Sequence, residues 1–451
     1  MTNIAAIFKA YDIRGKVGSE LTEDLVRRVG QSFGQWLPHD GPVVVGHDMR
    51  PDSGQLAEAL ARGITEAGRD VIDIGMVTSD MAVFGVTHFG AAGAAIITAS
   101  HNPGEYNGIK LFDDTPKTIG LDQGLDLIRD GAIGKTTPQV AAIPGAVTHE
   151  DLINPWVDYC LEFVDISNFK SVPVAIDCGN GMAGVVLEKL LPRLPFTTEK
   201  LYFEPDGTFP NHEANPQKLE TLADLQKTVK EKSRYLGIAF DGDGDRMAMI
   251  DETGRPVSGS EMMSLLASKY TAMPSPSFVY EVRTSRTVVD RLETQGFTAI
   301  RSKAGRSNIG EVMRRHNAVF GGETTGHFFF KDYWSNDSGM LSMLVALEQI
   351  FAQDRPLSEL ITSAHSTNPM IPETNFEVAD AQATLQQLSE TFAGNEQDWL
   401  DGLSVSVPGG WFNLRASNTE PVVRLNAEAA DQASLDTLVA QVTAVIEGSS
   451  A

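Results

Sequence analysis

The chain has 451 residues and a formal net charge of −24, with 42% hydrophobic and 21% charged residues. This composition is typical of a globular protein of about three domains, and the negative charge argues against nucleic acid or an anionic membrane surface as a partner. Two cysteines, Cys160 and Cys178, exclude both a disulfide framework and a Cys-x-x-Cys metal site.

The first residues show no cationic stretch followed by an apolar one, and no apolar run approaches the ~18 residues of a membrane-spanning helix. We therefore expect a cytoplasmic location without a membrane contact. The sequence leaves the oligomeric state open between monomer and dimer.

Strand-like apolar runs alternate with helical segments through most of the chain. The first run, residues 42–46, precedes a helical segment over 53–68, and further strands follow at 71–75 and 94–100. The same rhythm returns at residues 172–177, 277–282, 297–303 and 318–323. This alternation predicts parallel sheets covered by helices.

The last part of the chain has a different pattern. Residues 363–375 are rich in Pro, Ser, Thr and Asn and indicate a linker. The segments after it predict a helix over 379–394, antiparallel strands and a final helix. We predict an α/β protein with three related α/β domains and a C-terminal α+β domain, with boundaries at residues 1–147, 148–250, 251–366 and 367–451.

Asp241, Asp243 and Asp245 alternate with glycine directly after the apolar run YLGIAF. Carboxylates this close repel one another, and Mg²⁺ would hold them together through hard oxygen ligands. A solvated acidic turn is one alternative. An EF-hand loop ending at Glu252 is another, but its sixth position is Arg246 rather than Gly, and the flanks resemble strands.

Ser100 lies in the sequence TASHNP, after the apolar run AAIIT. Because Asn-Pro forces a turn, we expect Ser100 to be exposed at a loop tip, where it could also be a helix-capping serine. A hydrolase dyad with His101 is not expected, since adjacent side chains rarely point at each other. A serine beside a metal could instead carry a phosphoryl group, and Lys110 could bring an amine to the same loop.

Three further motifs have both a functional and a plain structural interpretation. Arg415 and Arg424 flank a turn rich in hydroxyl and amide groups, which suits an anion but also suits an ordinary surface loop. Glu323, Thr325 and His327 alternate in GGETTGH, so they can share one face and bind sugar hydroxyls, or form a glycine turn. The segment Gly179–Gly184 matches the dinucleotide pattern G-x-G-x-x-G, which we interpret as a close strand-to-helix turn away from the other motifs.

In this order, TASHNP, DGDGDR, GGETTGH and RASNTEP resemble the four signatures of the α-D-phosphohexomutase superfamily, over essentially the whole chain. KAYDIRG and SNTEP are similar to the phosphomannomutase/phosphoglucomutase branch. The phosphoglucosamine mutase branch usually has a Gly-Thr-Asp-Gly start and SGTEP instead. The resemblance implies four domains around a central cleft, the last of them of the TATA-box-binding-protein-like class.

The resemblance also implies residue roles. Ser100 would be the phosphorylated serine, and it would bind Mg²⁺ together with Asp241, Asp243 and Asp245. His101 and Lys110 would handle protons, with Arg246 and Arg14 nearby in the active site. The expected sugar contacts are Glu323, Thr325, His327, Arg283 and Arg306, and the expected phosphate contacts are Arg415, Ser417, Asn418, Thr419 and Arg424.

Two segments depart from the family pattern. GETTGH replaces the common GEMSGH but keeps a hydroxyl at Thr325. Arg306 stands where relatives often have His in Lys-Thr-Gly-His, so its contact with sugar or phosphate is left open.

The implied activity is interconversion of hexose 6-phosphate and hexose 1-phosphate through a phosphoserine enzyme and a hexose 1,6-bisphosphate intermediate. The sequence does not decide between mannose and glucose. Phosphoglucosamine mutase is the alternative within the class, and the alternatives outside it are a non-catalytic sugar-phosphate-binding protein and a calcium-binding module.

Overall fold

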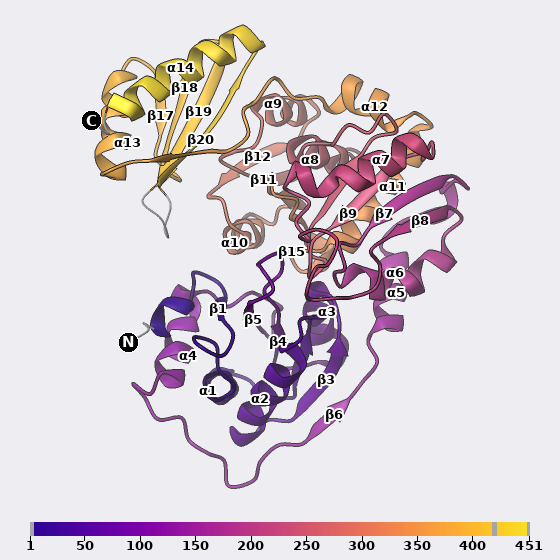
Figure 1. Ribbon diagram of the computed structural model, residues 1–451, viewed down its shortest axis with the longest axis vertical. Coiled ribbons are helices and arrows are strands. Elements are labelled where there is room, and N and C mark those ends of the chain that lie inside the picture. The colour runs from indigo at the N-terminus through magenta and orange to yellow at the C-terminus, as the bar shows by residue number, and fades with distance from the viewer. Residues whose placement is uncertain (1–3, 417–421, 449–451) are drawn as a thin grey trace. The chain divides into compact units, whose positions relative to one another are not determined.

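The computed structural model describes residues 4–416 and 422–448. These residues form two compact units, one comprising Met1–Val257 with Thr325–Leu360 and the other Ser258–Thr324 with Ile361–Ala451 (Figure 1). The chain therefore crosses from one unit to the other three times.

The first unit begins with a six-stranded sheet in the order β1-β5-β4-β2-β3-β6. Its strands are β1 (Ile13–Lys16), β2 (Val43–His47), β3 (Val71–Met76), β4 (Gly93–Ile97), β5 (Tyr106–Asp113) and β6 (Val147–His149). The strands β2, β3, β4 and β6 are parallel, as the sequence rhythm predicts. However, β5 runs antiparallel to both β4 and β1, because the short connection after β4 cannot make a crossover.

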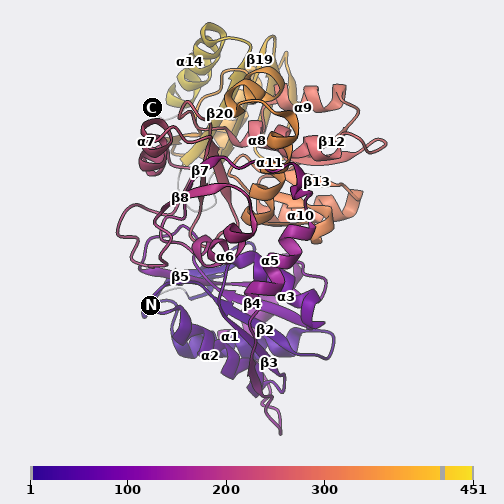
Figure 2. The same cartoon turned by 90° about the vertical axis from the view of Figure 1, so that its right-hand side faces the viewer.

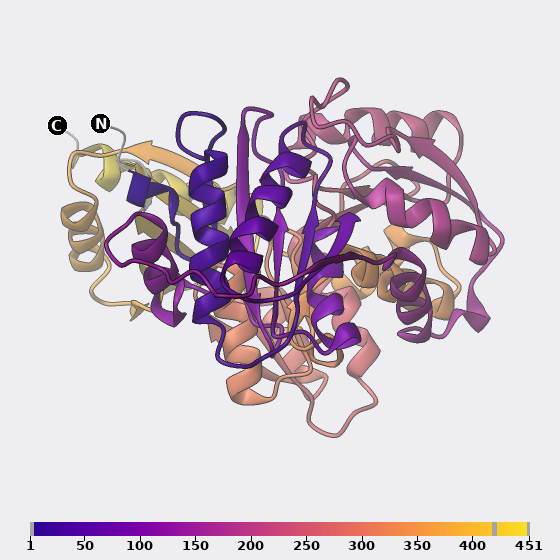
Figure 3. The same cartoon turned by 90° about the horizontal axis from the view of Figure 1, so that it is seen from below.

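Helices cover both faces of this sheet. They are α1 (Glu23–Trp36), α2 (Ser53–Glu66), α3 (Ser79–Phe89) and α4 (Leu125–Ala132). Figure 2 shows α1 and α2 on the face opposite α3, and Figure 3 looks onto the indigo helices of that face. The helices α1 and α2 pack closely against each other: a Cβ on Gly63 of α2 would lie 1.8 Å from the carbonyl oxygen of Arg27 on α1. Only glycine allows this contact.

The second sheet of this unit has the order β10-β9-β7-β8. Its strands are β7 (Pro173–Asp177), β8 (Thr197–Leu201), β9 (Gly237–Phe240) and β10 (Met247–Ile250). The strands β7, β8 and β9 are parallel, whereas β9 and β10 form an antiparallel hairpin. Its neighbouring helices are α5 (Ile153–Glu162), α6 (Ala183–Leu190) and α7 (Ala223–Glu231).

A later stretch of chain completes the first unit. It contributes β14 (Phe328–Phe330), β15 (Asn336–Asp337), α11 (Gly339–Gln353) and α12 (Leu357–Leu360). The pair β14 and β15 are antiparallel, and most of α11 is buried.

The second unit begins with three parallel strands, in which β11 (Ser277–Glu281) lies between β12 (Thr298–Ser302) and β13 (Phe320–Gly322). Its helices are α8 (Gly259–Ala267), α9 (Arg286–Thr294) and α10 (Arg306–His316). The predicted linker, residues 363–375, is partly regular structure: a π-helix, Ile361–His365, covers its start, and a strand from Thr374 covers its end.

The C-terminal sheet is antiparallel, as predicted, in the order β16-β20-β19-β18-β17. The strands are β16 (Thr374–Glu377), β17 (Glu396–Asp398), β18 (Leu403–Val407), β19 (Gly410–Ala416) and β20 (Val422–Ala429). Two helices, α13 (Ala381–Thr391) and α14 (Gln432–Gly448), lie on one face of it (Figure 1). Leu414 and Leu425 join the core beneath them, so alternation turns Arg415, Arg424 and Asn426 to the other face.

Short 3-10 helices occur at Ile4–Ile7, Leu121–Gln123, Ile166–Asn168, Leu191–Arg193, Leu219–Leu222, Ser268–Tyr270 and Lys331–Tyr333. Within the described ranges, no helix is both long enough and apolar enough to span a membrane. Both cysteines are buried and reduced, and burial raises the pKa of each thiol.

Candidate active site

Ser100 lies in the loop between β4 and β5, but it is buried rather than exposed at a tip: only 3% of its surface is accessible. Its backbone is left-handed, with φ of 51°, which is uncommon for a residue other than glycine. Its amide donates to Thr98 Oγ1 at 2.9 Å. The loop therefore holds the serine in one defined conformation inside the unit.

Arg50, from the segment after β2, stabilises this loop. Its guanidinium donates to four backbone carbonyl oxygens, those of Ser100 (3.0 Å), Asn102 (2.6 Å), Pro103 (2.9 Å) and Tyr106 (2.9 Å). No local motif marked Arg50 as a site residue, because its partners are main-chain atoms some fifty residues away.

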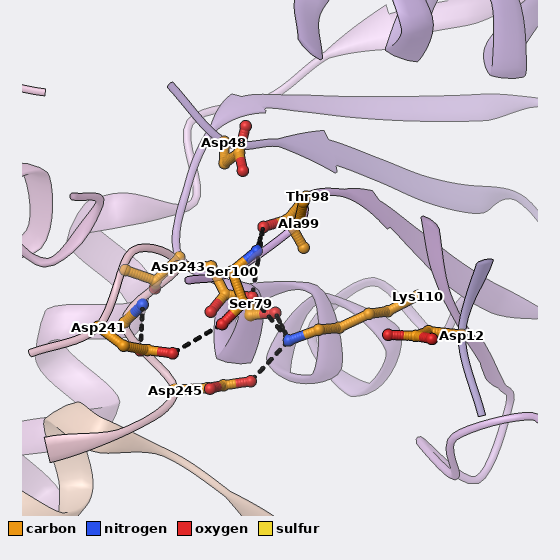
Figure 4. Close-up of polar contacts among 12 residues, drawn as sticks. Asp12, Asp48, Ser79, Thr98, Ala99, Ser100, Lys110, Asp241, Asp243 and Asp245 are labelled. Carbon is orange, nitrogen blue, oxygen red and sulfur yellow. Dashed lines mark hydrogen bonds and ion pairs between the residues drawn. The ribbon is translucent and has the colours of Figure 1, made fainter. Parts of the chain in front are cut away.

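The acidic loop between β9 and β10 meets the serine loop (Figure 4). Ser100 Oγ donates to Asp241 Oδ2 at 2.8 Å. The two main chains also touch, because a Cβ on Gly242 would lie 2.3 Å from the Ser100 carbonyl oxygen. The predicted convergence of serine and carboxylates is therefore present within one compact unit.

Lys110 reaches the same loop from β5 (Figure 4). Its Nζ donates to Asp243 Oδ2 and Asp245 Oδ2, each at 2.6 Å, and to Ser79 Oγ at 2.9 Å. The ammonium thus neutralises part of the charge of two buried carboxylates.

The three aspartates fit a hard divalent cation. Their side chains are fully buried, and one ligand oxygen from each lies within 4.8 Å of the others. Burial and the carboxylates Asp245 and Asp243 raise the pKa of Asp241 to about 7. Burial and Asp245 also raise the pKa of Asp243, but Lys110 and Arg246 outweigh them and the net shift is downward. Asp243 Oδ1 is buried with no hydrogen-bond partner among the described residues, which leaves a lone pair for an ion.

The flanking elements also distinguish between the metal-site types. Strands rather than helices lie on both sides of the loop, and Arg246 donates from its backbone and from Nε to Asp241. An EF-hand requires flanking helices and a glycine at the sixth loop position, where this chain has Arg246. The EF-hand interpretation is therefore excluded.

His101 and Arg14 complete the serine side of the site. Contrary to expectation, the adjacent His101 does turn toward the serine, with Nδ1 3.1 Å from Ser100 Oγ and in contact with Arg246. Burial, Arg246 and Arg14 lower the pKa of His101 to about 2, so its ring is neutral. Arg14, on β1, donates to the Ala99 carbonyl at 2.5 Å and to Asn102 Oδ1 at 2.7 Å.

His327 also belongs to this unit. Its Nδ1 lies 2.6 Å from Asp337 Oδ2 and 3.7 Å from Asp245 Oδ1. Residues 323–327 form a turn between β13 and β14, so strand alternation does not place Glu323, Thr325 and His327 on one face as expected. The unit boundary falls inside this turn, with Glu323 in the second unit and Thr325 and His327 in the first.

The second unit holds the remaining predicted sugar contacts. Glu323 accepts from the Gly305 amide at 2.5 Å, next to Arg306, which is buried at the start of α10. Arg283 donates through Nε to both oxygens of Glu281, at 2.9 and 3.0 Å. Burial raises the pKa of Glu281, but Arg283 outweighs it and the net pKa is lowered. Glu281 was missed from sequence because it ends an ordinary strand pattern.

Arg415 and Arg424 come together on the C-terminal sheet, as predicted. They are direct cross-strand partners of β19 and β20. Ser417, Asn418 and Thr419 lie outside the described residues. Sequence reasoning missed Glu373, whose carboxylate contacts both arginines and Arg283 as well. The structure therefore groups Arg283 with Arg415 and Arg424.

The glycine segment at residues 179–184 is a strand-to-helix turn, as interpreted, but it is not away from the other motifs. A Cβ on Gly181 would lie 2.8 Å from the Gly242 carbonyl oxygen, and the Met182 amide donates to the same oxygen at 2.9 Å. The backbone of this glycine turn therefore packs directly against the backbone of the acidic loop.

Four family models match the chain in order. They describe phosphoglucomutase/phosphomannomutase α/β/α domains I, II and III, at residues 5–132, 154–254 and 258–367, and the C-terminal domain at residues 373–445. The chain belongs to the phosphoglucomutase/phosphomannomutase family. The predicted family and fold class, an α/β multidomain protein with a distinct C-terminal domain, are confirmed.

Individual family members agree over nearly full length. The chain is 39% identical to a protein of Xanthomonas campestris strain B100 named "Phosphohexose mutases", over 98% of this chain and 99% of that protein. It is 36% identical to an Escherichia coli "Phosphomannomutase", with coverage of 98% and 99%. A phosphoglucomutase/phosphomannomutase family structure from Burkholderia thailandensis matches with a TM-score of 0.91 and 29% identity, covering 100% of this chain and 98% of that one.

Proposed function

We propose that this protein is a phosphohexomutase that interconverts hexose 6-phosphate and hexose 1-phosphate through phosphorylated Ser100. The observation that carries the proposal is the 2.8 Å hydrogen bond from Ser100 Oγ to Asp241 Oδ2, which joins a nucleophile and an acidic loop 141 residues apart. Family members named as phosphomannomutase and phosphohexose mutases support the same reaction class.

In the proposed reaction, phosphoserine 100 donates its phosphoryl group to the free hydroxyl of a hexose monophosphate. The O–P bond to serine breaks while the bond to the sugar hydroxyl forms, and the hydroxyl proton passes to a nearby base. The resulting hexose 1,6-bisphosphate then reorients, so that its other phosphoryl group faces the serine, and this group is returned to Ser100. Both half-reactions need one fixed serine and a proton-handling group close to it.

The residues around Ser100 suit these tasks. Arg246 Nη2 donates to Ser100 Oγ at 3.3 Å, so its charge can stabilise the oxygen anion that is left when the phosphoryl group departs. Lys110 lies within the same polar cluster and is the proposed proton carrier, with neutral His101 beside it. His327, fixed by Asp337, is a further candidate for proton transfer on the sugar side.

Asp241, Asp243 and Asp245 are the proposed ligands of Mg²⁺, with a phosphoserine oxygen completing the set. When bound, the ion would supply positive charge against the transferring phosphoryl group. The proposed phosphate contacts are Arg415, Ser417, Asn418, Thr419 and Arg424, and the proposed sugar contacts are Glu323, Thr325, His327, Arg283 and Arg306.

The decisive experiment replaces Ser100 with alanine. We expect the purified wild-type protein to carry about 80 Da of phosphoryl mass on the Ser100 peptide and to turn over mannose 1-phosphate or glucose 1-phosphate when primed with the bisphosphate. Ser100→Ala should lose both the added mass and the activity while unfolding at the same urea concentration. The control, Ser434→Ala on the exposed side of α14, should retain both.

Near-normal turnover by Ser100→Ala would contradict the phosphoserine mechanism. Glucosamine 1-phosphate in the same assay tests the phosphoglucosamine mutase alternative. Sugar-phosphate binding without any turnover would favour the non-catalytic binding protein. The cytoplasmic location and the absence of nucleic-acid partners stay predictions, and the oligomeric state stays open between monomer and dimer.

A further inference from the structure

Two arginines face each other directly on the C-terminal sheet. Arg415 of β19 pairs with Arg424 of β20, and both point to the face opposite the helices. Like charges at directly opposite positions of an antiparallel pair destabilise the sheet. Such a pair requires either a bound anion or a built-in counterion.

Glu373 provides the counterion. It directly precedes β16, which pairs with β20 so that Asn375 lies opposite Arg424. Since side chains two residues apart point to the same face, Glu373 shares the face of Arg424 and Asn426.

The carboxylate of Glu373 touches every cation of this group. Its Oε2 accepts from Arg415 Nη2 at 2.7 Å and from Asn426 Nδ2 at 3.1 Å, and lies 3.5 Å from Arg283 Nη1. Its Oε1 lies 3.7 Å from Arg424 Nη1. Burial raises the pKa of Glu373, but Arg415 and Arg283 outweigh it and lower the pKa to about 2, so the group stays ionised.

Glu373 leaves part of the Arg415 guanidinium available. A guanidinium has five N–H donors in a rigid fork. Glu373 engages Nη2, whereas Arg415 Nε is buried with no hydrogen-bond partner among the described residues. One nitrogen is thus anchored by protein, while the Nε donor has no partner among the described residues.

We propose that Glu373 is a positioning residue of the phosphate-binding arginine cluster. It holds Arg415 and Arg424 at a fixed spacing against their mutual repulsion, so that both guanidinium groups are positioned for the substrate phosphate that is not being transferred. This inference rests on the proposed function, because it assigns that phosphate to Arg415 and Arg424.

The direction in which anion affinity changes when Glu373 is removed distinguishes a positioning role from a purely electrostatic one. If Glu373 only added negative charge, its removal would strengthen anion binding. If Glu373 fixes the arginines, its removal lets two opposed cations separate and weakens anion binding, because preorganised donors bind better than mobile ones. Opposite outcomes therefore follow from one substitution.

The test is Glu373→Gln, which removes the charge and keeps the size. We expect KM for the hexose phosphate and the inhibition constant of inorganic phosphate to rise roughly tenfold, with a smaller change in kcat. Glu373→Asp, which restores the charge, should recover part of the loss. The control is Glu396→Gln on β17, at the far edge of the same sheet, and it should leave both constants unchanged.

An unchanged or lower KM in Glu373→Gln, with active wild-type protein, would overturn the inference and leave the mutase proposal intact. Inactive wild-type protein would overturn the mutase proposal. In that case calorimetric titration with mannose 6-phosphate would still decide the role of Glu373, since weaker binding by the variant supports positioning and equal or tighter binding contradicts it.

Discussion

At the scale of single residues, the conformation of Ser100 depends on side chains that no motif contains. Its left-handed backbone carries a cost on the order of 1 kcal/mol, which surrounding contacts must offset. Arg50 provides those contacts through four carbonyl oxygens. The Ser100 hydroxyl, the proposed phosphoryl carrier, is therefore positioned by a residue that need not touch the substrate.

Arg50→Lys tests this dependence. Lysine keeps the charge but cannot bridge four carbonyls, so we expect a loss of about 2–4 kcal/mol in the free energy of unfolding. We also expect kcat to fall roughly tenfold or more at nearly constant KM, because the serine loses its orientation. Urea denaturation and steady-state kinetics measure the two effects. Arg62→Lys, on the exposed side of α2, is the matched control, and a kcat within twofold of wild type in Arg50→Lys would refute the role.

Sequence predicted those site residues whose chemistry is concentrated in a short segment. Asp241, Asp243, Asp245, Ser100 and Lys110 all meet as expected. Arg50 and Glu373 could not be found in this way, because each has ordinary neighbours and acquires its role through contacts far along the chain. Glu281 was missed because it ends an ordinary strand pattern, although its partner Arg283 is only two residues away.

At the scale of elements, strand positions and most strand directions were predictable, but two strand reversals were not. The apolar runs gave β2, β3, β4, β7 and β9 within a few residues. However, the reversals into β5 and β10 depend on short connections whose path the hydrophobic pattern does not encode. These two reversals bring Lys110 and Arg246 to the serine and acidic loops.

The π-helix Ile361–His365 carries a buried histidine with a predictable pH effect. His365 Nδ1 lies 2.8 Å from Ser264 Oγ on α8, and burial, together with Arg291, lowers its pKa to about 4. The unfolded chain, with a histidine pKa near 6.5, binds more protons than the folded one between these values. Stability from this group is therefore full above pH ~6.5 and is lost as pH falls toward ~4.

We expect the wild-type protein to lose about 2 kcal/mol more unfolding free energy between pH 7 and pH 5 than His365→Gln does. Urea denaturation at the two pH values gives this difference. His316→Gln, at the exposed end of α10, should behave like wild type. Equal pH dependence in wild type and His365→Gln would show that His365 does not carry the effect.

At the scale of the whole molecule, the first unit is discontinuous in sequence. Helix α11 and the strands β14 and β15 belong to the first unit, but they follow residues 258–324 of the second unit in the sequence. Because most of α11 is buried, a fragment that lacks it would expose a large apolar surface.

Truncation measures this interdependence. We expect residues 1–257 alone to aggregate or to unfold without cooperativity, whereas residues 1–366 should fold. Residues 367–451 should fold independently, since their hydrophobic core is drawn from that segment alone. Far-UV circular dichroism with urea unfolding reports on each fragment, and a cooperative transition in 1–257 would contradict the requirement for α11.

The two buried cysteines have a practical consequence for measuring motion. Cys160 and Cys178 have no accessible surface, and burial disfavours the reactive thiolate of each. Fluorescent maleimide dyes should therefore ignore the native thiols and attach only to engineered ones. Leu127→Cys in the first unit and Met273→Cys in the second, both exposed positions, would make a donor–acceptor pair. Single-molecule energy transfer would then measure the distance between the two dyes during turnover. Neither Cys160 nor Cys178 would have to be replaced for this experiment.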